Sequence, residues 1–252
     1  MGYQVYLRSD LNLAVDATLT ASSANANFPA ANVIALPVSK PWRTTGDAAE
    51  SLLMNLGSAK AFDLVAIVGH NLTSAATITF SAGTTSACSD YSTAITWREG
   101  TAFKLLSATQ TYQYAKIAIA DAANTYTWLQ IGYVMLGAKV SPAWNFAWGW
   151  QYAQEHENLE TESEYGAPHV YELFNRTRLL LEYQNISRSY MAELTALVHA
   201  LKRNVTPLFL VPDTDINDGY LGRFTSNALV AVPYARSTAL EFLEDSSGKI
   251  VA

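Results

Sequence analysis

The 252-residue chain has a single cysteine, Cys88, and few charged side chains. One cysteine excludes a disulfide framework and any cysteine-rich metal or iron–sulfur site. Hydrophobic residues make up 50% of the chain and charged residues 15%, which excludes an intrinsically disordered protein. The 16 basic and 22 acidic side chains leave a formal charge of -6, which argues against sequence-specific nucleic-acid binding.

Long hydrophobic runs are missing as well. None approaches the roughly 20 residues that cross a bilayer. The N-terminus lacks the basic and then apolar layout of a signal peptide. We therefore expect a protein made without a secretion signal and without a membrane partner.

Motifs for catalysis and cofactor binding are absent too. No G-x-S-x-G elbow precedes any of the four histidines, and no glycine-rich phosphate loop occurs. Residues 213–219 match only the start of a calcium loop, because Asp218 replaces its glycine and Phe224 replaces its closing glutamate. The sequence therefore predicts a non-enzymatic protein with no catalytic residues, no cofactor and no metal.

Aromatic residues, by contrast, are frequent, at 12% of the chain. Together with β-branched residues they suit the half-buried faces of strands. In residues 1–140, short apolar segments end at turn residues, and no amphipathic helix is found. The segments predicted as strands are 52–56, 62–68, 76–80, 114–120 and 128–136. We expect this half to form a β-sandwich or jelly roll.

Charge divides the chain near residue 140. Residues 1–140 carry eight basic and eight acidic side chains, so residues 141–252 hold the whole charge of -6. An aromatic cluster follows the join. It consists of Trp144, Phe146, Trp148, Trp150 and Tyr152. We place a domain boundary here, with 1–140 forming one domain and 141–252 the other.

The second half contains one amphipathic helix, predicted from about 189 to 203. Its apolar stripe is Tyr190, Leu194, Leu197, Val198 and Leu201. Ser187 or Ser189 is expected to cap its start, and Asn204 to end it in a left-handed conformation. Predicted strands surround it at 177–183, 206–211, 222–224, 229–232 and 237–242. The whole chain is therefore expected to be mainly β, with a small β-barrel and one packed α-helix in its second half.

Residues 155–164 hold five carboxylates. Glu160, Glu162 and Glu164 alternate, so in a strand they share one face, where like charges repel unless a cation or basic partner lies opposite. The segment is therefore interpreted as a solvated acidic loop or arm, as an acidic contact surface, or as a cation site.

Ordered motifs in the first half resemble galactose-binding-like jelly rolls of the discoidin type. They are residues 21–23, 28–33, 42–44, 53–57, 62–68, 70–72, 128–132 and 136–137. The resemblance implies a sandwich with a sugar at its loop end. The residues assigned to sugar binding are Trp42, Arg43, His70, Asn71 and Trp97. Trp128 is a further aromatic that would suit sugar stacking, although tryptophans more often pack in cores, and Trp42 is also expected to close the core.

Residues 206–213, 220–224 and 239–244 resemble the C-terminal part of distal-tail and minor tail proteins of tailed bacteriophages. That resemblance implies a barrel that forms a ring at the tail tip, as a trimer or hexamer. Its partners would be the tail tube and hub, and its location the virion, after assembly in the bacterial cytoplasm. A jelly roll placed before the barrel departs from the more familiar domain order.

Two functions follow from these resemblances. The first is a structural protein of the phage tail tip or baseplate, and the alternative is a carbohydrate-binding protein that adheres to a host-surface glycan. The second half is expected to carry the oligomer interface. The residues assigned to that interface are Trp144, Phe146, Trp148, Trp150, Glu160, Glu162 and Glu164.

Overall fold

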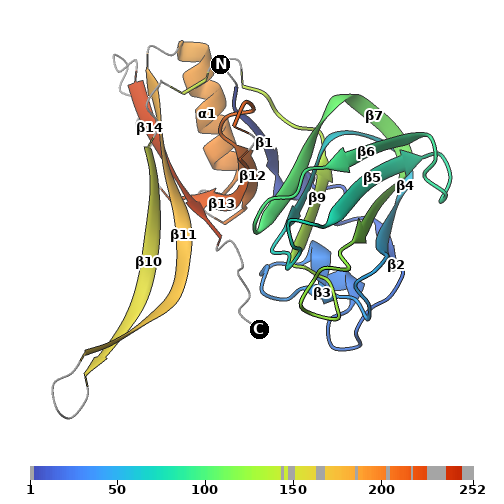
Figure 1. Ribbon diagram of the computed structural model, residues 1–252. Coiled ribbons are helices and arrows are strands. Elements are labelled where there is room, and N and C mark those ends of the chain that lie inside the picture. The colour runs from blue at the N-terminus through green and yellow to red at the C-terminus, as the bar shows by residue number, and fades with distance from the viewer. Residues whose placement is uncertain are drawn as a thin grey trace.

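The structure is a computed structural model that describes residues 3–142, 145–146, 151–162, 168–184, 187–202, 205–216, 218–225 and 237–245. Antiparallel strands dominate these residues, in two large sheets and a two-stranded one, together with one α-helix (Figure 1). The mainly β fold class is thereby confirmed.

The first large sheet forms the predicted β-sandwich. Its strands are β2 (Thr18–Ala21), β4 (Glu50–Val68), β5 (Thr77–Gly83), β6 (Tyr91–Ile95), β7 (Thr101–Ala120) and β9 (Tyr133–Gly137). They lie in the order β2-β4-β7-β5-β6, and β9 pairs with the second part of β4. The two-stranded sheet joins β3 (Trp42–Arg43) to β8 (Gln130–Ile131), and short 3-10 helices span Ser9–Leu11 and Ala30–Ile34.

Strand β4 is one long strand where the sequence predicted two. Gly57, expected to end a strand, has a φ of 75° inside β4, and the register with β7 shifts between Asn55 and Lys60. A bulge of this kind bends a strand pair without ending it. The first part of β4 therefore lies beside β2 and the second part beside β9.

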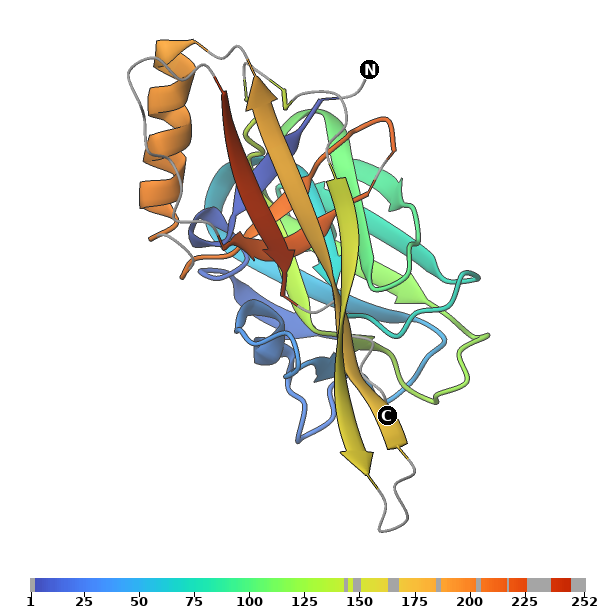
Figure 2. The same ribbon diagram turned by 90° about the vertical axis from the view of Figure 1, so that its left-hand side faces the viewer.

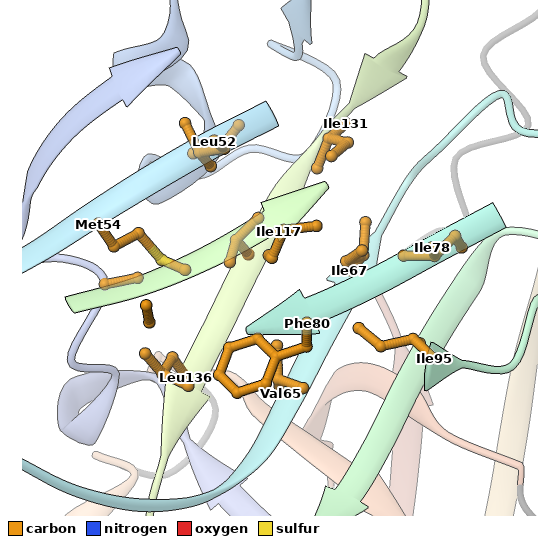
Figure 3. Packing of buried hydrophobic residues seen from close by; sticks show 14 of the residues in the cluster. Leu52, Met54, Val65, Ile67, Ile78, Phe80, Ile95, Ile117, Ile131 and Leu136 are labelled. Atoms are coloured by element: carbon orange, nitrogen blue, oxygen red, sulfur yellow. The ribbon is translucent and has the colours of Figure 1, made fainter. Parts of the chain in front are cut away.

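Inward-facing side chains of these strands fill the sandwich (Figure 3). Leu52 and Met54 of β4 belong to one buried cluster with Phe80 of β5 and Ile117 of β7. The rings of Phe62 and Phe80 meet edge to face, with centroids 5.8 Å apart. Full burial of such side chains contributes about 1.5–3 kcal/mol each, which gives the loops at the end of the sandwich a rigid base.

The second large sheet curves around the helix α1 (Arg188–Ala200) (Figure 1). Its strands, in spatial order, are β1 (Val5–Arg8), β12 (Leu208–Val211), β13 (Tyr220–Phe224), β14 (Ser237–Glu244), β11 (Pro168–Gln184) and β10 (Gln151–Glu162). The described strands form an open sheet with edges at β1 and β10, where the sequence predicted a barrel. The helix occupies the concave side, so its side chains fill the space that a closed barrel encloses.

Helix α1 begins and ends close to the predicted limits. The hydroxyl of Ser187 accepts a hydrogen bond from the backbone N–H of Tyr190, which confirms Ser187 as the N-cap. The predicted stripe is buried along its whole length. It packs against β11, β12 and β14. The left-handed residue after the helix is Lys202, with a φ of 49°, and Asn204 lies outside the described residues.

The two halves of the chain share a third buried cluster. Strand β1 comes from the start of the chain but pairs with β12 of the second sheet. Val5 and Leu7 of β1 pack with Leu64 of β4, and Phe103 of β7 meets Phe209 of β12 edge to face at 5.4 Å. Residues 5–8 therefore lie in the sheet of the second half, whereas the sequence placed them in the first domain. The division near residue 140 stays a prediction.

Strands β10 and β11 extend beyond the rest of the sheet as a long hairpin (Figure 2). Strand β14 pairs with β11 only from Arg178 to Gln184. From Arg176 toward the tip, the described parts of β10 and β11 pair only with each other. The described part of the acidic segment, residues 155–162, thus lies in a projecting arm, one of the interpretations left open by the sequence.

Candidate functional site

Loops from four parts of the chain meet at one end of the sandwich, around the small β3–β8 sheet (Figure 1). Backbone hydrogen bonds join them. The N–H of Asn25 donates to the carbonyl of Arg43 at 2.8 Å, that of Thr44 to Leu129 at 2.9 Å, and that of Asp121 to Asp47 at 2.9 Å. The loop end is therefore a connected surface and not a set of independent loops.

Arg43 lies at the centre of this loop end. Its guanidinium carbon is 4.1 Å from the ring centre of Phe28 and 4.2 Å from that of Trp128, so two aromatic rings cover the cation. Its Nε donates to Oε1 of Gln130 at 2.9 Å, and the same two residues pair across β3 and β8. The guanidinium is therefore fixed in position by its neighbours.

A second aromatic pair extends the surface. The rings of Tyr126 and Trp128 have centroids 4.9 Å apart and are tilted by 31°. Tyr126 is 39% exposed, and Trp128 and Phe28 are half-buried. The loop end thus presents aromatic faces beside a guanidinium, a combination of apolar and donor groups that suits a ligand with both kinds of surface.

Asn71 connects these loops by hydrogen bonds. Its side-chain amide donates to the carbonyl of Trp128 at 3.1 Å and accepts from the N–H of Gln130 at 2.7 Å. Asn124 donates to the carbonyl of Asn71 at 3.0 Å. Of the five residues assigned to sugar binding, Arg43 and Asn71 therefore meet at the loop end, with Asn71 positioning Trp128.

Of the other three assigned residues, Trp42 and His70 are buried beneath this surface and Trp97 is half-buried. Trp42 is 1% exposed, and its Nε1 donates to the carbonyl of Ser23 at 2.9 Å, so its ring is not open to a sugar. His70 is buried, and burial lowers its pKa to about 4. Trp97 donates to the carbonyl of Leu72 at 2.9 Å and packs against the sandwich core. These three side chains support the loops.

Phe28, Tyr126 and Gln130 were not identified as site residues from the sequence. They come from different loops or strands, and only the fold brings them to Arg43. The available signals were Phe28 and Gln130, which belong to the motifs 28–33 and 128–132 of the jelly-roll resemblance. The sequence contained no signal for Tyr126, which lies outside these motifs.

The residues assigned to an oligomer interface differ in where the structure places them. Phe146 is 6% exposed and its ring lies 6.4 Å from that of Tyr183, so it is a core residue and not a surface contact. Glu160 and Glu162 are exposed on β10, opposite Val170 and Pro168, which carry no compensating charge. Trp144, Trp148, Trp150 and Glu164 lie outside the described residues.

The remaining features with potential chemistry are structural. Cys88 is buried, which raises the pKa of its thiol. In the calcium-like segment the N–H of Asp215 donates to Oδ1 of Asp213 at 2.9 Å, a local turn. In the described parts of the chain, no cluster of three or more His, Cys, Asp or Glu is placed to bind a metal.

A cavity of about 410 Å³ lies away from the loop end, between residues 36–39 and the second sheet. Its charged groups have partners within the protein, and Arg176 pairs with Glu155 of β10. Arg223 donates to Asp245 at 2.5 Å, and the buried carboxylate of Glu244 accepts from the N–H of Thr177 at 3.0 Å. We therefore interpret it as part of the junction between the two halves.

None of the described helices has the length and apolar character needed to cross a membrane.

Comparisons with known proteins return structural neighbours only. No family profile and no curated protein matches the sequence. Chitosan-binding module 1 of a Paenibacillus sp. IK-5 chitosanase/glucanase is 20% identical, with a TM-score of 0.41, and half of this chain matches 97% of that one. The lectin domain of lectinolysin complexed with Lewis B antigen is 14% identical, with a TM-score of 0.43, and covers 50% of this chain and 96% of its own.

A family 32 carbohydrate-binding module of C. perfringens NanJ, in complex with galactose, is also similar. It is 17% identical, with a TM-score of 0.41, and 54% of this chain matches 99% of that one. These neighbours are carbohydrate-binding modules with a galactose-binding-like fold.

Proposed function

We propose that this chain is a non-enzymatic carbohydrate-binding protein that holds a sugar at the loop end of its sandwich. The observation that carries the proposal is the guanidinium of Arg43, fixed between Phe28 and Trp128, with Tyr126 beside them. Sugar rings have apolar C–H faces and polar hydroxyl edges. The loop end offers aromatic faces for the first and hydrogen-bond donors for the second.

The rigidity of the loops supports the same proposal. Asn71 and Gln130 are already hydrogen-bonded in the free protein, and so is the backbone of Trp128. A surface that is ordered before binding loses little conformational entropy when a ligand arrives. A weak ligand such as a single sugar depends on a surface that is already ordered, because it makes too few contacts to offset a large loss of conformational entropy.

Glycan-array screening followed by calorimetry tests this proposal. We expect wild-type protein to bind a glycan, and Tyr126→Ala and Trp128→Ala to weaken binding by about tenfold or more, a loss of about 1.4 kcal/mol. Tyr171→Ala is the matched control, because Tyr171 is 58% exposed on the distant hairpin. No binding by wild-type protein, or equal losses in Tyr126→Ala and Tyr171→Ala, would refute the proposal.

A second candidate function is that of a structural protein of a phage tail tip, assembled through the second half and located in the virion. The hairpin β10–β11 favours it. Two-stranded ribbons are marginally stable alone in water, and unpaired edges invite a partner. Leu159, Val170 and Tyr171 expose apolar side chains there, and Leu159 and Tyr171 are cross-strand neighbours. A closed ring, trimeric or hexameric, needs two different patches of this kind on each copy.

Light scattering coupled to size-exclusion chromatography tests the second candidate. We expect wild-type protein to form an oligomer and the double variant Leu159→Ser with Tyr171→Ser to be monomeric and folded. Ile216→Ser is the control, since Ile216 is equally exposed but lies in a turn outside the hairpin. A wild-type monomer at all concentrations would remove the support for this role.

A further inference from the structure

We infer that the loop end prefers a sugar that bears a carboxylate, such as a uronic acid, over the neutral sugar of the same shape. The inference rests on the proposed carbohydrate-binding function and names the class of sugar for that site. Its basis is the state of Arg43. Its guanidinium carbon lies over two rings, 4.1 Å from the centre of Phe28 and 4.2 Å from that of Trp128, and its Nε donates to Gln130.

The terminal nitrogens of Arg43 retain donor capacity. Among the described residues, no side chain or backbone oxygen accepts a hydrogen bond from its Nη1 or Nη2, and no carboxylate lies within ion-pair distance. Neither nitrogen is sealed from solvent. The open edge of the guanidinium is therefore the one that carries the two Nη atoms, which keep their hydrogen-bond donors available.

The carboxylates of the loop end are oriented to other partners. Glu50 accepts hydrogen bonds from the hydroxyls of Ser22 and Ser23. Asp121 accepts from the N–H and the hydroxyl of Thr73, both at 2.7 Å. Asp47, in the loop after β3, makes no ion pair with Arg43. The charge of Arg43 is thus left without a direct counterion among the described residues.

A carboxylate matches this open edge better than a hydroxyl does. Two parallel N–H groups in one plane form a bidentate pair with the two oxygens of a carboxylate. Such a charge-assisted pair is roughly twice as strong as neutral hydrogen bonds. The sugar ring attached to the carboxylate would then lie near Tyr126 and Trp128.

Calorimetry on the full chain with galactose, galacturonic acid and the methyl ester of galacturonic acid, beside an array of acidic and neutral glycans, tests the inference. We expect acidic glycans to dominate the array. Galacturonic acid should bind at least about tenfold more tightly than galactose or the ester, with a preference that falls as salt is added. The ester keeps the shape of the acid and removes its charge, so wild-type protein alone suffices for this comparison.

Arg43 variants then locate the preference. Arg43→Lys keeps the charge but loses the two parallel N–H groups, so the preference for galacturonic acid should fall several-fold. Arg43→Gln removes the charge as well and should abolish the preference. Thermal unfolding reports whether each variant folds. If a variant does not fold, the comparison of galacturonic acid with its methyl ester on wild-type protein still tests the inference. Binding of neutral glycans alone, or equal affinity for acid and ester, overturns the inference and leaves the proposed function standing. Binding of no glycan overturns both.

Discussion

Trp42 and Arg43 are neighbours in β3, and their side chains leave opposite faces of the strand. Trp42 enters the sandwich core, and Arg43 reaches the loop end between two rings. One dipeptide thus anchors the loops and supplies the central group of the site. Substitutions at the two positions should therefore affect different properties of the protein, stability at Trp42 and binding at Arg43.

Trp42→Ala should lower the free energy of unfolding by about 3–5 kcal/mol, because it removes a fully buried indole and its hydrogen bond to Ser23. Urea denaturation of the full chain measures this. Tyr126→Ala, at an exposed ring of the same loop end, should cost less than about 1 kcal/mol. A Trp42→Ala value as small as that of Tyr126→Ala would mean that Trp42 is a surface residue.

His70 should make stability depend on pH. Burial lowers its pKa to about 4, against 6.5 in an unfolded chain, so the unfolded state gains a proton first as the pH falls. Stability that is complete above pH 6.5 should therefore decline toward pH 4, by about 3 kcal/mol from this group. Denaturation series at several pH values, compared with His70→Asn, isolate the effect. Identical pH profiles for the two proteins would exclude a buried neutral His70.

At the scale of elements, predictions succeeded where the signal is local. The helix was predictable because its stripe and its Ser187 cap lie within a few turns of sequence. Strand β4 was divided in two because Gly57 usually signals a turn, and only its pairing with β7 shows that the strand continues. Arg43 and Asn71 were found through the jelly-roll resemblance, whereas Tyr126 and Gln130 reach them through long-range pairing.

The helix supports a prediction with its own control. Leu197→Ala should destabilise the protein by about 2–5 kcal/mol, because Leu197 lies in the buried cluster that α1 shares with the second sheet. Lys202→Ala should stay within about half a kcal/mol, since Lys202 is exposed just after the helix. Chemical denaturation compares the two. Equal losses would contradict the observed orientation of the helix.

At the scale of the whole molecule, the halves are joined by an apolar cluster and by β1. Phe103 from the first half and Phe209 from the second are both fully buried in it. Arg98 and Asp218 form an ion pair across the same junction. A fragment ending at residue 140 would contain β1 and Phe103 without their partners on β12. The two halves are therefore expected to depend on each other for stability.

Phe209→Ala tests this dependence. It should cost about 3–5 kcal/mol, and its effect should be less than additive with Phe103→Ala, because the two rings contact each other. We expect the full chain to unfold in one calorimetric transition that both variants shift. Two separate transitions, with Phe209→Ala moving only one of them, would show that the halves are thermodynamically independent.

The central claim is that a sugar binds at Arg43, and NMR titration of the labelled full chain tests it most directly. On addition of a glycan identified by array, the signals of the Arg43 Nε–H, the Trp128 indole N–H and the Asn71 side-chain amide should shift together and saturate. Signals from α1 and from the β10–β11 hairpin should not move. Shifts confined to the hairpin or to the cavity between the halves, with Arg43 unchanged, would contradict the account.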